Sequence, residues 1–188
     1  MNPQPPFALW ANRKSWRALG LSLLLAAGSR GSPAASPPEA TRVTLGGEQV
    51  FDVGFNKLAS FSYTIVDEAT GASPEQIAAA RKRDQIPAWL RFYQDKRVAL
   101  TGFLLPLQLQ DGLAKKFVLM KDVNTCCYGA VPGMNDYVVV TMSGDGASPA
   151  QDIPVVVIGK LHIEEKYENG LVVSLFELAG DKYLGPAK

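Results

Sequence analysis

The stretch that decides the fold runs from Arg97 to Leu107 and reads RVALTGFLLPL. Val98 and Leu100 alternate with smaller neighbours, which is the two-residue period of a half-buried β-strand. Gly102 inside this run predicts a bulge or a sharp bend. Pro106 has no N–H to give to a neighbouring strand, so we expect it where no donor is needed. The stretch therefore predicts a strand with a bend near its middle.

Four further β-rich runs follow this strand. Asp111-Gly112 and Asn169-Gly170 are hairpin turn signals, and the second is the strongest short hairpin signal in the chain. The runs are 116–120, 137–142, 153–163 and 171–178. Five short strands with a bent first strand predict a mainly β fold, a small five-stranded OB-like barrel over residues 96–188. A small sandwich is the alternative, because the helix that this barrel type usually carries between its third and fourth strands is not predicted here.

Residues 36–95 are predicted to form strands and a helix that pack on the barrel. Strands are expected over 50–55 and 61–66, which are rich in β-branched and aromatic residues. Ser73-Pro74-Glu75-Gln76 predicts a helix start, because Ser73 can cap, proline suits the first turn, and Gln76 stands three residues after the cap. Ile86-Pro87 ends that helix.

Residues 1–35 are predicted to be a signal peptide and linker. The cationic Arg13, Lys14 and Arg17 precede an uncharged apolar run over 18–28, which is shorter than the roughly 20 residues that span a bilayer. Cleavage after Gly28 or after Ala35 fits the small residues there. The sequence thus predicts a protein of the bacterial periplasm or cell envelope that meets the membrane only through a transient signal peptide. A helix of the mature domain is the alternative.

Composition restricts the function classes. The 188 residues are 47% hydrophobic and 20% charged, with a formal net charge of +1, so one ordinary globular domain is expected and nucleic acid is disfavoured as a partner. Cys126 and Cys127 are the only cysteines and His162 is the only histidine, which excludes a disulfide scaffold and a His-rich metal site. No Gly-x-Ser-x-Gly, phosphate-binding glycine loop or His-Glu-x-x-His motif is present, so we favour a binding role over an enzymatic one.

The adjacent thiols of Cys126 and Cys127 lie in a predicted loop, and three interpretations stay open. They can ligate a thiophilic metal such as zinc, form a vicinal disulfide, or be buried as small hydrophobic residues. Free thiols are unusual in exported proteins, because that environment is oxidising, and a metal ligated by both thiols would explain why they are retained. Two ligands do not complete a zinc site, so His162 is the first candidate to add, followed by Asp122, Asp136, Glu164 and Glu165.

Strand alternation indicates how His162 is oriented. Leu161 and Ile163 are expected to face the core, so His162 faces solvent or a cleft, unless a bulge at Gly159 reverses the phase. A surface histidine with no role is the alternative.

Several of these segments resemble one known family. They are 96–107, 117–120, Cys126-Cys127-Tyr128-Gly129 with Pro132 and Asn135, and 157–162. Together they resemble the exported bacterial domain-of-unknown-function family 3299 over about residues 50–183. The resemblance implies an OB-like barrel in an envelope protein, with envelope or transporter proteins as partners, since some members are associated with zinc-responsive transport genes. Some relatives carry Cys-x-His in this loop, and Tyr128 stands at that position here.

The sequence thus predicts an exported periplasmic accessory or binding protein. Its site is expected at the Cys-Cys loop, with Cys126, Cys127 and His162 as ligands of a thiophilic metal such as zinc and Tyr128, Pro132 and Asn135 as further loop residues. The alternative is a structural or interaction module of the cell envelope, with buried or disulfide-linked cysteines and no metal.

Overall fold

The computed structural model of the protein describes residues 40–123 and 132–187. The described residues all belong to one compact unit. In chain order its elements are β1 (Arg42–Leu45), β2 (Glu48–Asp52), α1 (Phe55–Leu58), the 3-10 helix η1 (Glu68–Thr70), α2 (Pro74–Arg81), the 3-10 helix η2 (Leu90–Tyr93), β3 (Arg97–Gln110), β4 (Leu113–Met120), β5 (Tyr137–Met142), β6 (Pro154–Glu168) and β7 (Leu171–Pro186). The predicted mainly β class is confirmed.

Within the described residues, all seven strands belong to one sheet with the order β1-β2-β3-β4-β5-β7-β6 and an additional pairing of β3 with β6. The β2–β3 and β5–β7 pairs are parallel, and the other pairs are antiparallel. Following the pairings from β3 through β4, β5, β7 and β6 therefore leads back to β3.

The two predicted hairpin turns are confirmed. Asp111 and Gly112 have φ angles of 52° and 78°, and Asn169 and Gly170 have φ angles of 51° and 83°. Positive φ at both central residues is what a two-residue hairpin turn of type I′ requires. The strands that these turns join extend further than predicted, to Gln110 in β3 and Pro186 in β7.

Gly102 is needed for close packing, and of the predicted bulge or sharp bend there, the bulge does not form. The β3–β6 pairing continues through Gly102 opposite Val155 without a shift in register. A Cβ atom at this position would lie 2.6 Å from the Met120 carbonyl oxygen and 2.9 Å from the Phe55 ring. Any larger residue would therefore push apart β3, β4 and α1.

The predicted helix start is confirmed, because Ser73 and Gln76 form a reciprocal capping box at α2. The Gln76 N–H donates to Ser73 Oγ at 3.3 Å, and the Ser73 N–H donates to Gln76 Oε1 at 2.7 Å. The strand predicted over 50–55 is right only in part, since β2 ends at Asp52 and α1 begins at Phe55.

Residues 61–66 form no strand, and that prediction is wrong. The Gln85 amide takes the place of a strand neighbour: it accepts from the Thr64 N–H and donates to the Thr64 carbonyl, both at 3.0 Å. At Thr64 a side chain therefore takes up the backbone groups that a neighbouring strand would otherwise pair.

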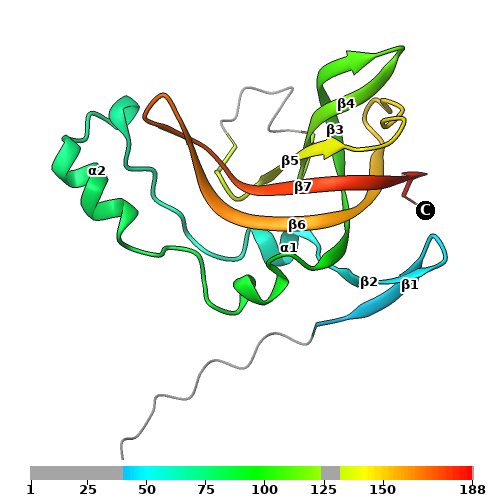
Figure 1. The fold of residues 1–188 in the computed structure, drawn as a ribbon, viewed down its shortest axis with the longest axis horizontal. Helices are drawn as coiled ribbons and strands as arrows, with labels where there is room; N and C mark the ends of the chain where they lie inside the picture. The colour runs from blue at the N-terminus through cyan, green and yellow to red at the C-terminus, as the bar shows by residue number, and fades with distance from the viewer. Residues whose placement is uncertain (1–39, 124–131, 188) are drawn as a thin grey trace, which may run out of the picture. The chain divides into compact units, whose positions relative to one another are not determined.

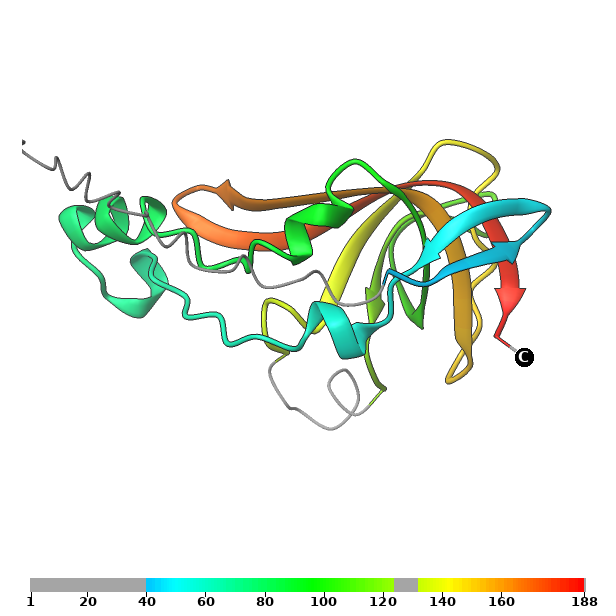
Figure 2. The same ribbon diagram turned by 90° about the horizontal axis from the view of Figure 1, so that it is seen from below.

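The β6–β7 hairpin reaches the segment that carries η1 and α2 (Figures 1 and 2). The Arg81 guanidinium of α2 lies 4.1 Å from the centroid of the Tyr167 ring in β6. Asp67, which caps η1 and is buried, accepts a hydrogen bond from the Val172 N–H of β7 at 3.4 Å. Aromatic and polar contacts thus hold residues 67–81 against the hairpin.

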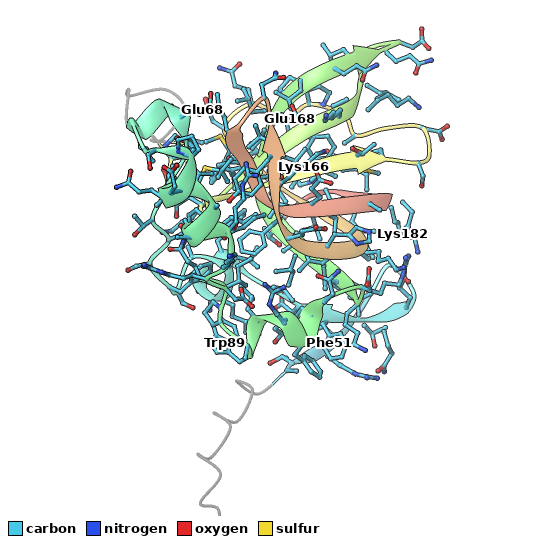
Figure 3. All side chains as sticks on the ribbon, turned by 60° about the vertical axis from the view of Figure 1, so that its left-hand side comes forward. Phe51, Glu68, Trp89, Lys166, Glu168 and Lys182 are labelled. Atoms are coloured by element: carbon cyan, nitrogen blue, oxygen red, sulfur yellow. The ribbon has the colours of Figure 1, made fainter. Side chains whose placement is uncertain are left out.

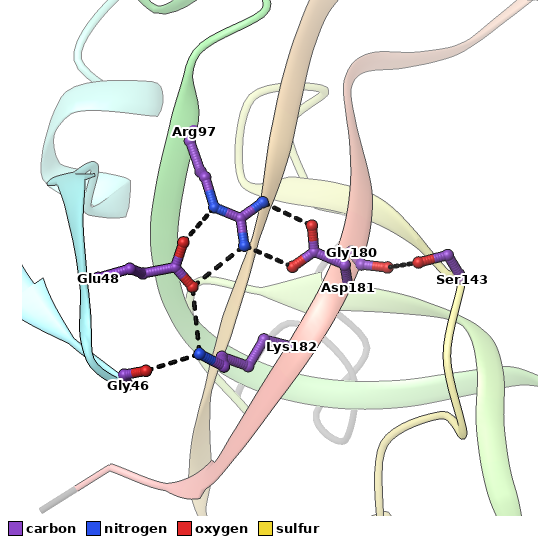
Figure 4. A network of polar contacts seen from close by, with 7 residues as sticks. All are labelled: Gly46, Glu48, Arg97, Ser143, Gly180, Asp181 and Lys182. Atoms are coloured by element: carbon purple, nitrogen blue, oxygen red, sulfur yellow. Dashed lines mark hydrogen bonds and ion pairs between the residues drawn. The ribbon is translucent and has the colours of Figure 1, made fainter.

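A network of charged side chains fastens the β1–β2 hairpin to β3 and β7 (Figure 4). Arg97 of β3 donates to Asp181 of β7, at 2.5 and 2.8 Å, and also to the Glu48 carboxylate of β2. Lys182 donates to the Gly46 carbonyl at 2.6 Å and approaches Glu48 at 3.3 Å.

In the parts of the chain that the structure describes, no helix is long and apolar enough to cross a bilayer.

Candidate functional site: a groove on the outer face of the sheet

One row of paired residues crosses five strands on the outer face of the sheet. Leu105 pairs with Val118, Val118 with Val139, Val139 with Glu177, and Glu177 with His162. Directly paired residues on neighbouring strands point to the same face. The row therefore changes along its length from three apolar side chains to a carboxylate and an imidazole.

The apolar part of this row lies in a groove of about 400 Å³. Its floor and walls come from strands β3, β4, β5, β6 and β7 and from Pro132, which precedes β5. The lining residues are Leu105, Leu107, Lys116, Val118, Met120, Pro132, Tyr137, Val139, Lys166, Glu168, Val173, Ser174 and Glu177. Most of these are apolar, which together with a few polar groups is the usual character of a ligand site.

Ser174 is a buried polar residue beneath the groove. It is 1% exposed, and among the described residues its hydroxyl has no hydrogen-bond partner. Leaving a buried hydroxyl unpaired costs free energy, about 1–3 kcal/mol. Ser174 has the strand parity of the buried Phe176 and the opposite parity of Glu177, so its hydroxyl is directed to the core side of β7.

Two ion pairs form the charged rim of the groove. The Lys166 ammonium donates to Glu177 at 2.6 Å and lies 3.8 Å from Glu168 (Figure 3 labels Lys166 and Glu168 on β6). The hydrogen bond to Glu177 raises the pKa of the Lys166 ammonium, so this cation stays charged.

His162 faces outward as predicted. Leu161 and Ile163 are buried at 0% and 1% exposure, whereas the His162 side chain is 42% exposed. The β6–β7 register does shift beside Gly159, but His162 keeps the orientation that alternation predicts.

The carboxylate of Asp95 fixes the imidazole of His162. His162 Nδ1 lies 2.9 Å from Asp95 Oδ1, and Gln94 Nε2 donates to Asp95 Oδ2 at 3.3 Å. Asp95 has a φ angle of 57°, and its N–H donates to the Leu161 carbonyl at 2.8 Å. With Nδ1 directed at a carboxylate, the Nε2 atom is left for another partner, an arrangement common among metal-binding histidines.

A second pocket of about 290 Å³ surrounds His162 and adjoins the groove. Lys166 and Glu177 line both spaces. The second pocket is also lined by Glu164, Glu165 and Tyr167. An apolar groove thus continues into a pocket in which carboxylates predominate.

The predicted loop residues have different outcomes. Cys126, Cys127 and Tyr128 lie outside the described residues. Pro132 lines the groove. Asn135 has a structural contact: its Nδ2 donates to the Phe61 carbonyl at 2.5 Å and holds the extended 61–66 segment.

Of the acidic residues considered as further ligands, Glu164 and Glu165 line the His162 pocket, whereas Asp122 and Asp136 do not. Asp136 accepts from the Gly133 N–H at 3.1 Å and approaches Lys121 at 3.4 Å, while Asp122 lines a smaller pocket beside β3. Glu165 accepts from the Tyr167 hydroxyl at 2.9 Å, and Glu164 is exposed beside His162. Within residues 40–123 and 132–187, no group of three or more His, Cys, Asp or Glu residues is placed to hold a metal ion.

Sequence reasoning missed Ser174, Lys166, Glu177 and Asp95. The alternation of apolar and polar residues shows which side chains of a single strand point outward. The row from Leu105 to His162 also depends on the order and register of five strands, which alternation does not give. Asp95 follows η2 in a left-handed conformation that has no strong sequence signal, although aspartate tolerates it better than most residues.

Fold and site together define a mainly β protein with a ligand-sized groove on its sheet. The family described as "Protein of unknown function (DUF3299)" matches residues 52–182, and the chain belongs to this family, as the sequence resemblance predicted. A crystal structure of a DUF3299 family protein from Pseudomonas aeruginosa PAO1 is similar, with 17% sequence identity and a TM-score of 0.48, over 73% of this chain and 95% of that chain. No curated protein matches the chain.

Proposed function

We propose that the protein is an exported binding protein of the bacterial cell envelope and that its ligand binds in the groove on the outer face of β4 and β5. The observation that carries this proposal is the groove itself, a depression of about 400 Å³ with a mostly apolar lining that includes the exposed Leu105 and Leu107. Envelope or transporter proteins are the partners that we propose for it.

We further propose that residues 96–188 form an OB-like barrel. Support comes from the closed series of pairings β3-β4-β5-β7-β6-β3 and from the parallel β5–β7 pair. Such barrels bind their ligands on the face of the second and third strands. Counted from β3, those strands are β4 and β5, which line the groove.

An uncharged apolar dye, N-phenyl-1-naphthylamine, tests binding in the groove. We expect its fluorescence to rise on binding, and Leu107→Ser to weaken binding about tenfold, because Leu107 lines the groove. Leu109→Ser is the matched control, since Leu107 and Leu109 are both 56% exposed and Leu109 does not line the groove. Equal binding by both variants and the parent chain would refute the proposal.

Zinc handling is a second proposed function, and the Asp95–His162 pair favours it. A carboxylate that holds Nδ1 directs Nε2 outward, as in carboxylate–histidine–zinc arrangements. In this proposal His162 is the one zinc ligand among the described residues, and Cys126 and Cys127 would supply two thiolate ligands. Three protein ligands and one open position are typical of zinc sites that exchange a ligand.

Equilibrium dialysis with zinc and reduced mature protein tests this second proposal. We expect about one zinc per chain, lost in the Cys126→Ser/Cys127→Ser double variant and bound about tenfold more weakly by Asp95→Asn. Zinc uptake that is the same in the parent chain and the double variant would exclude a site at the thiols. If, in addition, the thiols of the native protein react only after denaturation, the metal-free interaction module is the better description.

A further inference from the structure

We infer that a smaller cavity beside β3 binds a small apolar amine in its ammonium form. The cavity is a different site from the groove, and the inference does not rest on the ligand proposed for the groove.

The cavity lies between the middle of β3, the end of β4 and the segment that precedes β6. Its volume is about 250 Å³, and most of its lining side chains are apolar. The lining residues are Phe103, Leu104, Leu105, Pro106, Met120, Asp122, Val123, Pro149, Ala150, Gln151 and Asp152. Sites for drug-sized molecules have volumes of roughly 300–1000 Å³, so a ligand of this cavity has to be smaller.

The cavity adjoins the groove, but separate leucines identify each space. Leu105 and Met120 line both. Leu104 lines only the cavity, and Leu107 lines only the groove. Substitutions of these two leucines can therefore tell in which space a ligand binds.

The charged side chains that line the cavity are both carboxylates. They belong to Asp122 and Asp152, and among the described residues no lysine, arginine or histidine lines the cavity. Asp152 takes part in none of the ion pairs between described residues. Lys121, next to Asp122 in the chain, has its ammonium 3.4 Å from Asp136. Residues 124–131, which follow Val123, contain no charged residue.

An apolar lining with two carboxylates favours an ammonium group carried by an apolar molecule. The apolar part of such a ligand gains free energy by leaving water, and its ammonium group meets charges of opposite sign. A ligand with a carboxylate would meet charges of the same sign. A metal ion is disfavoured, because within the described residues no three His, Cys, Asp or Glu side chains are placed to hold one.

Three indoles with the same ring and different charges test the inference. They are tryptamine, which is a cation at pH 7, the uncharged 3-ethylindole, and the anion indole-3-propionate. Titrations followed by saturation-transfer NMR of the ligand give a Kd for each. We expect tryptamine to bind about threefold more tightly than 3-ethylindole and about tenfold more tightly than indole-3-propionate, since an exposed ion pair contributes modestly.

Two pairs of variants locate the ligand and its ammonium group. Leu104→Ser should weaken tryptamine binding about fivefold, whereas Leu107→Ser should leave it unchanged. Asp152→Asn should reduce the affinity for tryptamine about threefold, to that for 3-ethylindole. Asparagine also tolerates the φ angle of 54° at this position. Asp145→Asn, at an exposed residue that does not line the cavity, should change nothing.

Gln151→Lys keeps the inference testable if Leu104→Ser does not fold. Gln151 is exposed and lines the cavity, so a lysine there adds a cation without removing apolar packing. We expect this variant to bind indole-3-propionate more tightly than tryptamine, which reverses the order of the parent chain. Gln110→Lys makes the same substitution at an exposed residue outside the cavity and should keep the order of the parent.

Three results would overturn the inference. They are the absence of binding by any of the indoles, equal affinities for all three, and an order of affinities that Gln151→Lys leaves unchanged. Binding that Leu107→Ser abolishes and Leu104→Ser retains would overturn it as well, and would place the indoles in the groove. If instead tryptamine binding depends on Leu104 and the apolar dye shows no dependence on Leu107, the cavity site stands and the proposed groove is wrong.

Discussion

At the scale of single residues, Glu48 shows how the edge of the sheet depends on charge. Hydrogen bonds from Arg97 and Lys182 lower the pKa of the Glu48 carboxyl from 4.5 to about 2. A carboxyl whose pKa is lower in the folded chain adds stability above its ordinary pKa and loses that contribution as the pH falls toward its folded pKa. The attachment of the β1–β2 hairpin should therefore weaken between about pH 4.5 and pH 2.

Glu48→Gln tests this dependence. We expect the variant to melt at a lower temperature than the parent chain at pH 7, and this difference to shrink at pH 3, where part of the Glu48 contribution is already lost in the parent. Thermal unfolding followed by circular dichroism at the two pH values measures it. Asp145→Asn, at an exposed carboxyl outside the network, serves as the control. A difference that is as large at pH 3 as at pH 7 would show that the charge of Glu48 is not its source.

Single residues also show how far the sequence predicts the site. The outward direction of His162 follows from the apolar neighbours Leu161 and Ile163, and the structure confirms it. Asn135 was expected in a functional loop, but its amide holds the Phe61 carbonyl. Ser174 lies inside a β-rich run, where nothing in the sequence distinguishes a serine that lines a groove from one that has a partner.

At the scale of elements, the sequence predicted structure that depends on neighbouring residues and missed structure that depends on contacts distant in the chain. Asp111-Gly112 and Asn169-Gly170 predict their hairpins because two residues suffice to set positive φ. The segment 61–66 has the composition of a strand but forms none, and the Gln85 amide, 21 residues away, pairs with the backbone of Thr64 instead. Its fate depends on a tertiary contact that composition does not encode.

Pro106 protects an exposed edge of β3. β6 pairs with β3 only from Arg97 to Phe103, so within the described residues the stretch from Leu104 to Gln110 pairs with β4 alone. This stretch carries no charge, and charged residues are a common protection of such edges. Here the edge is protected in another way. Pro106 lacks an N–H, and the register shifts that follow it disturb the regular edge.

We therefore expect Pro106→Val to promote self-association through this edge. Valine restores the N–H and favours extended backbone, so the molar mass of the variant should rise with protein concentration while that of the parent chain does not. Size-exclusion chromatography with light scattering measures it. Adding Leu107→Lys to Pro106→Val should restore the parent mass, because a lysine on an edge opposes pairing. A variant whose mass stays at the parent value would show that the register shifts alone protect the edge.

At the scale of the whole molecule, the number of strands after residue 96 was predictable but their neighbours were not. The five strands expected from residue 96 onward correspond to β3–β7. The parallel β5–β7 pair and the β3–β6 pair join strands that are distant in sequence, so no local turn signal specifies them. The β5–β7 pairing joins Val139 to Glu177 in the row that ends at His162, which is why the groove emerges only from the assembled sheet.

The export proposal makes the last prediction, because the pairings of the described sheet begin at Arg42, after both predicted cleavage sites. When the full chain is expressed in a bacterium, we expect the periplasmic fraction to contain a protein that lacks 28 or 35 residues by intact mass. Leu24→Arg should keep the uncleaved chain in the cytoplasm, because a charge interrupts the apolar run, whereas Leu24→Ala preserves the run and should allow export. The cleaved protein and a chain that begins at Ser36 should unfold at the same temperature, since both retain every described pairing. An uncleaved protein in the cytoplasm for the parent and both variants would make the first 35 residues part of the mature chain, and the groove would then have to find its ligand inside the cell.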